Sequence, residues 1–159
     1  MKRLPKHLRP RWRYLAVELE TWPDAGFDRR TFQQRCWWAC QDLLGDVGAA
    51  AIDLSVMRFE HADGAGHAVV QVRRGTVDRA RAALACIDAV DDDPVGIRVR
   101  GVAGTVRACE EKYLGREAEA TRQRGVVFQN VESDAVVRHG RVDVRCDDAF
   151  AGATTTDLH

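Results

Sequence analysis

Residues 94–114, PVGIRVRGVAGTVRACEEKYL, decide the predicted fold because they describe a strand that runs directly into a helix. Apolar and charged side chains alternate over Gly96–Val102, which is typical of a strand with one buried face. The helix is expected to begin at Thr105, since threonine readily accepts hydrogen bonds from the free N–H groups of a first helical turn. The stretch therefore predicts one strand–turn–helix unit.

The turn in this unit carries the residue types of an anion-binding corner. Gly101 and Gly104 flank it, and glycine lets backbone N–H groups come close to a ligand. A helix N-terminus attracts anions, and three arginines add positive charge nearby: Arg98, Arg100 and Arg107. An ordinary strand-to-helix turn that binds nothing fits the same residues equally well.

Three more strands and two more helices follow from the patterns elsewhere in the chain. The strands are expected at residues 11–20, Ile52–Glu60 and His67–Arg73. The helices are expected from Asp28 to about Leu44, with Gly45 as the stop, and over Val77–Val90. Asp63-Gly64 predicts a tight hairpin between the second and third strands.

This order predicts an α+β fold, a ferredoxin-like β-α-β-β-α-β sandwich with a four-stranded antiparallel sheet and an added C-terminal helix. The first and third strands are central in that topology, and the fourth lies beside the first. The first two helices cover one face with apolar stripes: Phe32, Cys36, Cys40 and Leu43, then Ala80, Ala83, Leu84 and Ile87. The third helix is expected to continue into the charged stretch that ends at Arg124.

Composition divides the chain into three regions. Residues 1–10 are a basic flexible arm, and residues 11–124 are the ferredoxin-like domain. Residues 125–159 are a C-terminal extension, with a short hairpin over 136–144 and then a disordered tail.

Charge and cysteine content limit the classes of function. The 24 basic and 24 acidic residues balance, yet the first 17 residues carry six cations and no acid, which suggests an anionic partner. Arginines outnumber lysines 21 to 3, a bias that suits phosphate binding but also follows from a GC-rich genome. Five cysteines without a C-x-x-C pair favour a reducing cytoplasm over a disulfide framework or a zinc site. No apolar run is long enough to cross a membrane, and the basic N-terminus lacks a signal region.

The sheet face turned away from the first two helices is a candidate RNA surface. By alternation it carries aromatic and basic side chains: Trp12, Tyr14, Gln71, Arg73, Arg98 and Arg100. Aromatic rings beside arginines stack on bases and hold phosphates. The alternative is that Trp12 and Tyr14 pack under the third helix as a second small core.

A second corner, Arg73-Arg74 before Gly75-Thr76, resembles the corner at Gly101 and Gly104, although a solvated turn is the favoured interpretation there.

Catalytic patterns are weak. Asp91–Asp93 could hold magnesium, but contiguous aspartates before a proline favour a solvated turn. No Walker lysine accompanies the glycine turn, and the five histidines do not pair with a nucleophile. We therefore expect neither catalytic residues nor a metal site.

Trp38 lies outside the apolar face of its helix, which fits either a partner surface or a lone exposed ring.

Two stretches resemble the archaeal ribonuclease P protein component 2 family. They are LRPRWRYLAVEL at residues 8–19, and GIRVRGVAGTVRACEEKYL at residues 96–114, with its Gly-x-x-Gly-Thr turn and Lys-Tyr-Leu ending. The likeness extends over residues 8–115.

The resemblance implies an accessory subunit of ribonuclease P, which removes the 5′ leader from precursor tRNA. In that enzyme the RNA subunit hydrolyses the phosphodiester bond with magnesium. It implies a complex with ribonuclease P RNA, protein component 3 and other protein subunits, with precursor tRNA contacted indirectly. The expected RNA-binding residues are Arg9, Arg11, Trp12, Arg13, Tyr14, Arg73, Arg98, Arg100, Gly101, Gly104, Thr105 and Arg107, and the expected partner residue is Trp38. The alternative function is a ferredoxin-like regulatory module that binds a small anionic ligand at the same corner.

Overall fold

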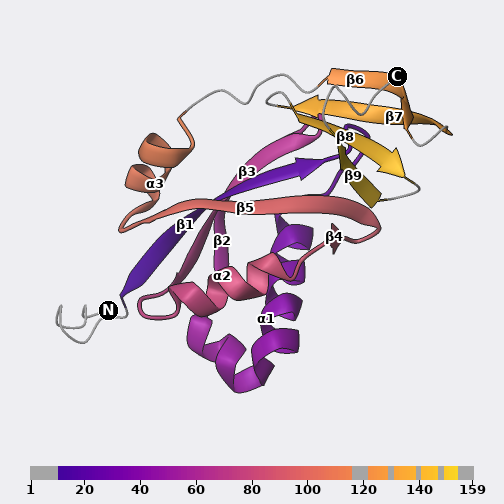
Figure 1. Ribbon diagram of the computed structural model, residues 1–159. Helices are drawn as coiled ribbons and strands as arrows, with labels where there is room; N and C mark the ends of the chain where they lie inside the picture. Colours follow the sequence, from indigo (N-terminus) through magenta and orange to yellow (C-terminus); the bar gives the residue numbers. More distant parts are fainter. Residues whose placement is uncertain (1–10, 116–121, 129–130, 139–140, 147–148, 154–159) are drawn as a thin grey trace.

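The described residues form two antiparallel sheets and three helices (Figure 1). The computed structural model describes residues 11–115, 122–128, 131–138, 141–146 and 149–153. The arm at 1–10 and the end of the tail at 154–159 therefore lie outside the described residues. Within the described part, no helix combines the length and the apolarity needed to cross a membrane.

The main sheet has the strand order β2-β3-β1-β5-β4. Its strands are β1 (Trp12–Thr21), β2 (Ser55–Ala62), β3 (Ala65–Arg73), β4 (Ala89–Val90) and β5 (Asp93–Ala103). The first strand lies between the third and the last, as the sequence predicted.

The count of four strands is wrong, because β4 adds a fifth. Ala89 and Val90 pair with Pro94 and Asp93, whereas the sequence pattern placed them in a helix. Asp91 takes a positive φ of 52°, a conformation that aspartate tolerates, and this closes the tight turn between β4 and β5.

The hairpin between β2 and β3 forms at Asp63-Gly64, as predicted. Both residues have positive φ, 55° and 82°, which is the requirement of the hairpin turn that matches strand twist. Ala62 therefore pairs directly with Ala65.

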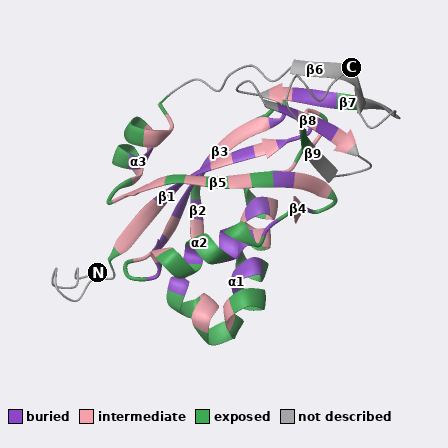
Figure 2. Ribbon diagram, viewed as in Figure 1, coloured by how far each residue is buried: buried purple, intermediate pink, exposed green. Residues whose placement is uncertain are grey.

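Two helices cover one face of the main sheet: α1 (Arg29–Ile52) and α2 (Val77–Ala85). The Asp28 side chain accepts a hydrogen bond from the Thr31 N–H and caps α1. The helix breaks at Gly45, whose φ is 72°, but helical structure resumes and continues to Ile52. Strand β2 consequently begins three residues later than expected. Figure 2 shows buried residues on the inner sides of both helices and exposed residues on their outer sides.

The core between these layers is formed by the predicted stripes and by Leu15, Val17 and Leu19 from β1. Leu43 is the exception, since 46% of it is exposed. It lies two residues before Gly45, where α1 is kinked.

The opposite face of the main sheet carries α3 (Val106–Tyr113). The second sheet follows α3 in the chain and has the strand order β6-β7-β8-β9. Its strands are β6 (Arg122–Phe128), β7 (Val131–Arg138), β8 (Arg141–Cys146) and β9 (Ala149–Ala153). Residues 122–124 therefore belong to a strand and not to a longer third helix. The boundary placed at Gly125 falls inside β6. The predicted hairpin is present in the pairing of β7 with β8, although residues 139–140 at its tip lie outside the described part.

Candidate nucleic-acid interface

Three segments meet where β1 begins. Trp12 pairs with Arg73 at the end of β3, and Tyr14 pairs with Ala103 at the end of β5. Because β3 and β5 both run antiparallel to β1, the two glycine-containing corners that follow them come to the same end of the sheet. Figure 1 shows this end beside the N-terminus, with the β3–α2 and β5–α3 connections next to it.

We call this region the basic end of the sheet. It comprises residues from all three segments: Arg11, Arg13, Arg73, Arg74, Gly104, Thr105 and Arg107. The sequence suggested each corner separately, but only the strand register unites them.

The backbone ties the basic end together. The Arg74 N–H donates to the Arg11 carbonyl over 2.8 Å, so these two exposed arginines lie side by side. Nη1 of Arg13 donates to the Trp12 carbonyl at 3.3 Å. The same Nη1 lies 3.8 Å from where a Cβ on Gly104 would stand, so Arg13 reaches towards the second corner.

The arginines of the basic end differ in how far their charge is neutralised. Arg73 forms a 3.0 Å ion pair with Asp53, and its guanidinium lies 5.0 Å from the centre of the Trp12 ring. Arg107 forms a 2.8 Å ion pair with Glu111 one helical turn away, but its side chain is 86% exposed. Among the described residues, no carboxylate pairs with Arg11, Arg13 or Arg74. These three are therefore the cations most available to a phosphate.

Two helix N-termini add positive potential to this end, because α2 and α3 begin there. The Thr105 hydroxyl accepts a hydrogen bond from the Ala108 N–H at 3.1 Å and caps α3, as predicted. Thr76 makes no such cap, since its hydroxyl donates to the Arg73 carbonyl at 2.6 Å.

The face of the main sheet turned away from α1 and α2 is only partly open, because α3 packs on part of it. Tyr14 packs with Ala16, Val69 and Cys109 in a second small core, which was the alternative to an RNA surface. Trp12 does not belong to that cluster, and its partner is Arg73. The structure thus supports the second-core alternative for Tyr14, whereas RNA binding by Trp12 stays a prediction.

Gly101 has a packing role that the sequence did not suggest. A Cβ at this position would stand 2.1 Å from Cζ of Tyr113, so the tyrosine ring occupies the space that we expected a ligand to use. RNA binding at Gly101 stays a prediction, and the packing of Tyr113 argues against close ligand approach there. Gly104, by contrast, is exposed.

Arg98 and Arg100 lie away from the basic end. Arg98 pairs directly with Glu18, four residues further along β1 than Tyr14, or about 13 Å at the rise of a strand. Arg100 forms a 3.1 Å ion pair with the same Glu18. The acidic partner weakens the expectation that this part of the face binds phosphate. Arg9 lies outside the described residues.

The three buried thiols, Cys36, Cys40 and Cys109, are not suited to nucleophilic catalysis. Burial raises the pKa of Cys36 far above its ordinary value, and burial also raises that of Cys40. Burial, and then the charge of Glu110, raise the pKa of Cys109 to about 11. All three thiols are protonated at neutral pH. In the described part of the chain, no group of three or more His, Cys, Asp or Glu side chains is arranged to hold a metal ion.

Exposed apolar side chains concentrate on α1. Of the five large ones in the described residues, four belong to this helix: Trp37, Trp38, Leu43 and Val47. Trp38 is 51% exposed, in agreement with its predicted position outside the core face. Trp37 is fixed, because its Nε1–H donates to the Leu54 carbonyl at 2.7 Å. The sequence missed the exposure of Leu43 because the course of α1 at Gly45 decides it.

Comparison with known proteins finds a matching family model and relatives that share one name. The model of the Rpp14/Pop5 family matches residues 13–114. Ribonuclease P protein component 2 of Haloarcula marismortui is 58% identical over 160 residues, which cover 99% of each chain. The protein of the same name from Halorubrum lacusprofundi is 55% identical over 157 residues, again 99% of each chain.

More distant matches cover less of the chain. Ribonuclease P protein component 2 of Methanosarcina mazei is 34% identical over 117 residues, which make up 74% of this chain and 96% of that protein. A chain of the solved structure titled "Cryo-EM structure of yeast Ribonuclease MRP" aligns with a TM-score of 0.46 and 16% identity, over 63% of this chain and 79% of that chain. The family model and the full-length relatives agree, and the chain belongs to the Rpp14/Pop5 family, among its archaeal members named ribonuclease P protein component 2.

Proposed function

We propose that the chain is an accessory protein subunit of ribonuclease P, which assists the catalytic RNA in removing the 5′ leader from precursor tRNA. The observation that carries this proposal is its family membership together with the basic end of the sheet. Relatives whose alignments cover 99% of this chain are named as components of that enzyme. The reacting groups then belong to the RNA, and the protein supplies contacts to it.

The basic end is the surface that we assign to the RNA. Three arginines without a carboxylate partner among the described residues, two helix N-termini and the Trp12 ring lie within one region. Phosphate oxygens accept paired hydrogen bonds from arginine, and the half-buried Trp12 beside Arg73 provides an aromatic ring for a base to stack on. Arg98 is an exposed cation at a distance, so we place it at the margin of this surface.

The fold and location belong to the same proposal. We infer that the main sheet and its helices are a variant of the ferredoxin-like sandwich, supported by the strand order β2-β3-β1-β5 and by two helices on one face. The free cysteines Cys36, Cys40, Cys86 and Cys109 support a reducing cytoplasm. Magnesium is proposed to act with the RNA of the complete enzyme.

Reconstitution tests the proposal. Ribonuclease P RNA and protein component 3 are combined with precursor tRNA, with and without this chain, over a range of magnesium concentrations. The chain is expected to raise the cleavage rate or to lower the magnesium concentration that half-maximal cleavage requires. If neither quantity changes, the chain is not a subunit of this enzyme.

A second test concerns protein partners. We propose that Trp38 on α1 contacts component 3, because a half-exposed tryptophan is the residue type most enriched at binding hot spots. Trp38→Ala is expected to weaken capture of purified component 3 without lowering the free energy of unfolding. Met57→Ala, which removes an exposed apolar side chain from β2 instead, is the matched control. Equal losses in both variants would mean that Trp38 is not part of the interface.

A regulatory module that binds a small anion is the competing function. Such a module needs an enclosed site, whereas Gly104, Thr105 and Arg107 are all exposed. Inorganic phosphate and small organic phosphates are therefore expected to leave the melting temperature unchanged. A clear rise in melting temperature would favour the regulatory function.

A further inference from the structure

The second sheet contacts the main sheet at the end of β1 that lies opposite the basic end. β1 finishes at Thr21, and Trp22 and Asp24 follow in the loop that leads to α1. Arg145 lies on β8 of the second sheet. In Figure 1 the second sheet lies beside this end of β1, and the N-terminus lies at the other.

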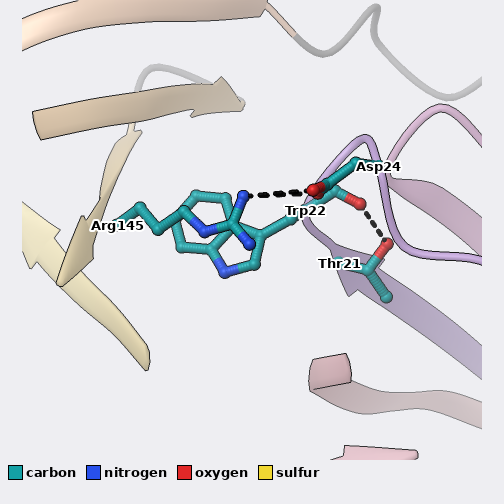
Figure 3. A network of polar contacts seen from close by, with 4 residues as sticks. All are labelled: Thr21, Trp22, Asp24 and Arg145. Carbon is teal, nitrogen blue, oxygen red and sulfur yellow. Dashed lines mark hydrogen bonds and ion pairs between the residues drawn. The ribbon is translucent and has the colours of Figure 1, made fainter. Parts of the chain in front are cut away.

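Arg145 makes two different contacts with this loop (Figure 3). Its guanidinium carbon lies 5.3 Å from the centre of the Trp22 ring. Its Nη1 donates to Asp24, at 3.3 Å from Oδ2 and 3.4 Å from Oδ1. Trp22 is 2% exposed, whereas the side chain of Asp24 is 65% exposed. The stacked contact is therefore the sheltered one, and the ion pair is open to solvent.

The surface that receives Arg145 is held firmly by the main sheet. The Thr21 hydroxyl donates to the Trp22 carbonyl at 3.0 Å, which leaves it to accept a hydrogen bond from Nε2 of His61 at 2.8 Å. The Thr21 N–H donates to the Gly64 carbonyl at 2.9 Å. The backbone next to Trp22 is thus fixed to the β2–β3 hairpin, and the indole is presented in a defined position.

The face of the second sheet that is turned towards this loop carries Val136, Asp143 and Arg145. Asp143 pairs directly with Val136, so Val136 and Arg145 lie on the same face by strand alternation. Val136 is buried there. Arg145 therefore projects from the same face as a buried valine, and 30% of its own side chain is exposed.

We propose that Arg145 docks the C-terminal sheet onto the main sheet, chiefly by stacking on Trp22, with the Asp24 ion pair as a secondary contact. The two contacts respond differently to salt. Screening acts over about 3 Å at 1 M ionic strength, so an exposed ion pair fades while a stacked, sheltered guanidinium persists. The docking is accordingly expected to survive molar salt.

This docking gives the extension a fixed place within the subunit. The family model ends at residue 114, and the second sheet follows it. Arg145 holds that sheet at the end of β1 opposite Arg11 and Arg74, so the described strands of the second sheet lie away from the basic end (Figure 1).

The test uses the full-length chain and compares Arg145→Ala, Arg145→Gln and Asp24→Asn. Arg81→Ala, which removes an exposed arginine from α2, is the matched control. Small-angle X-ray scattering measures the radius of gyration, and the indole N–H signal of Trp22, assigned through Trp22→Phe, reports on the contact itself. Both are measured at about 0.1 M and about 3 M KCl, where screening differs most.

Both Arg145 variants are expected to increase the radius of gyration and to shift the Trp22 signal at both salt concentrations. Asp24→Asn is expected to keep the wild-type radius at high salt, and Arg81→Ala at both. A wild-type radius and Trp22 signal in both Arg145 variants would overturn the docking role. Expansion of Asp24→Asn at high salt equal to that of Arg145→Ala would overturn the primacy of stacking.

Discussion

Substitution of Gly101 by alanine tests the packing of α3 on the main sheet. The new Cβ would stand 2.1 Å from Cζ, 2.2 Å from Cε1 and 2.7 Å from Cε2 of Tyr113, so it would enter the ring itself. The ring must move away, and it is held in the small cluster with Ala16, Val69 and Cys109. Overpacking of this kind costs about 1–3 kcal/mol. We expect Gly101→Ala to lower the free energy of unfolding by that amount.

The same strand contains a matched control. A Cβ on Gly96 would meet nothing closer than 3.8 Å, which is ordinary contact. Neither glycine has a positive φ among the described backbone, so alanine fits both conformations. Gly96→Ala is therefore expected to be neutral, or to stabilise by up to about 1 kcal/mol through the lower chain entropy of the unfolded state.

A double-mutant cycle isolates the contact. With Tyr113→Ala in the background, Gly101→Ala has no ring to displace, and its cost should disappear. The expected coupling between the two sites is at least about 1 kcal/mol, measured by urea unfolding of the four proteins. Additive effects would refute the reasoning. Weaker RNA binding by Gly101→Ala with unchanged stability would instead restore the view that Gly101 admits a ligand.

Two further predictions concern stability. His61 stacks on Phe27 at 4.8 Å, and burial lowers its pKa below the ordinary 6.5. The unfolded chain therefore takes up the proton first, so the free energy of unfolding should fall as the pH drops below about 6.5 and level off below the folded pKa. His61→Gln should remove this dependence in urea titrations at successive pH values, and an unchanged slope would mean that another group is responsible. Trp37→Phe should cost about 1 kcal/mol, because the Leu54 carbonyl loses its donor, whereas Trp38→Phe should cost less than about 0.5 kcal/mol. Equal costs in thermal unfolding would contradict the assigned roles of these neighbours.

Local patterns predicted most of the main sheet and its helices. The Asp63-Gly64 turn, the cap at Thr105 and the alternation along β1 each act over a few residues, and the sequence contains all of that information. The error at Ala89–Val90 has a physical cause. Their apolar character suits a helix end or a short strand, and the pairing with Pro94 and Asp93 decides between them.

The candidate site was less predictable because it depends on register. No local pattern shows that Arg11 and Arg74 lie side by side, or that the ring of Tyr113 fills the space over Gly101. Arg98 and Arg100 looked equivalent to the other arginines until the pairing of β1 with β5 placed Glu18 beside them. Strand pairing therefore shows that Glu18 neutralises Arg100, whereas the local spacing of four residues already pairs Arg107 with Glu111.

The measurement that tests the central claim most directly is the salt dependence of binding to ribonuclease P RNA. Each phosphate contact contributes about 0.7–0.9 to the slope of log K against log salt concentration. The double variant Arg11→Ala/Arg74→Ala is expected to flatten the slope by about 1.5 relative to the wild type. Arg30→Ala, an exposed arginine on α1 at the other end of β1, should leave the slope unchanged. A wild-type slope in the double variant, or an equal change with Arg30→Ala, would contradict RNA binding at the basic end of the sheet.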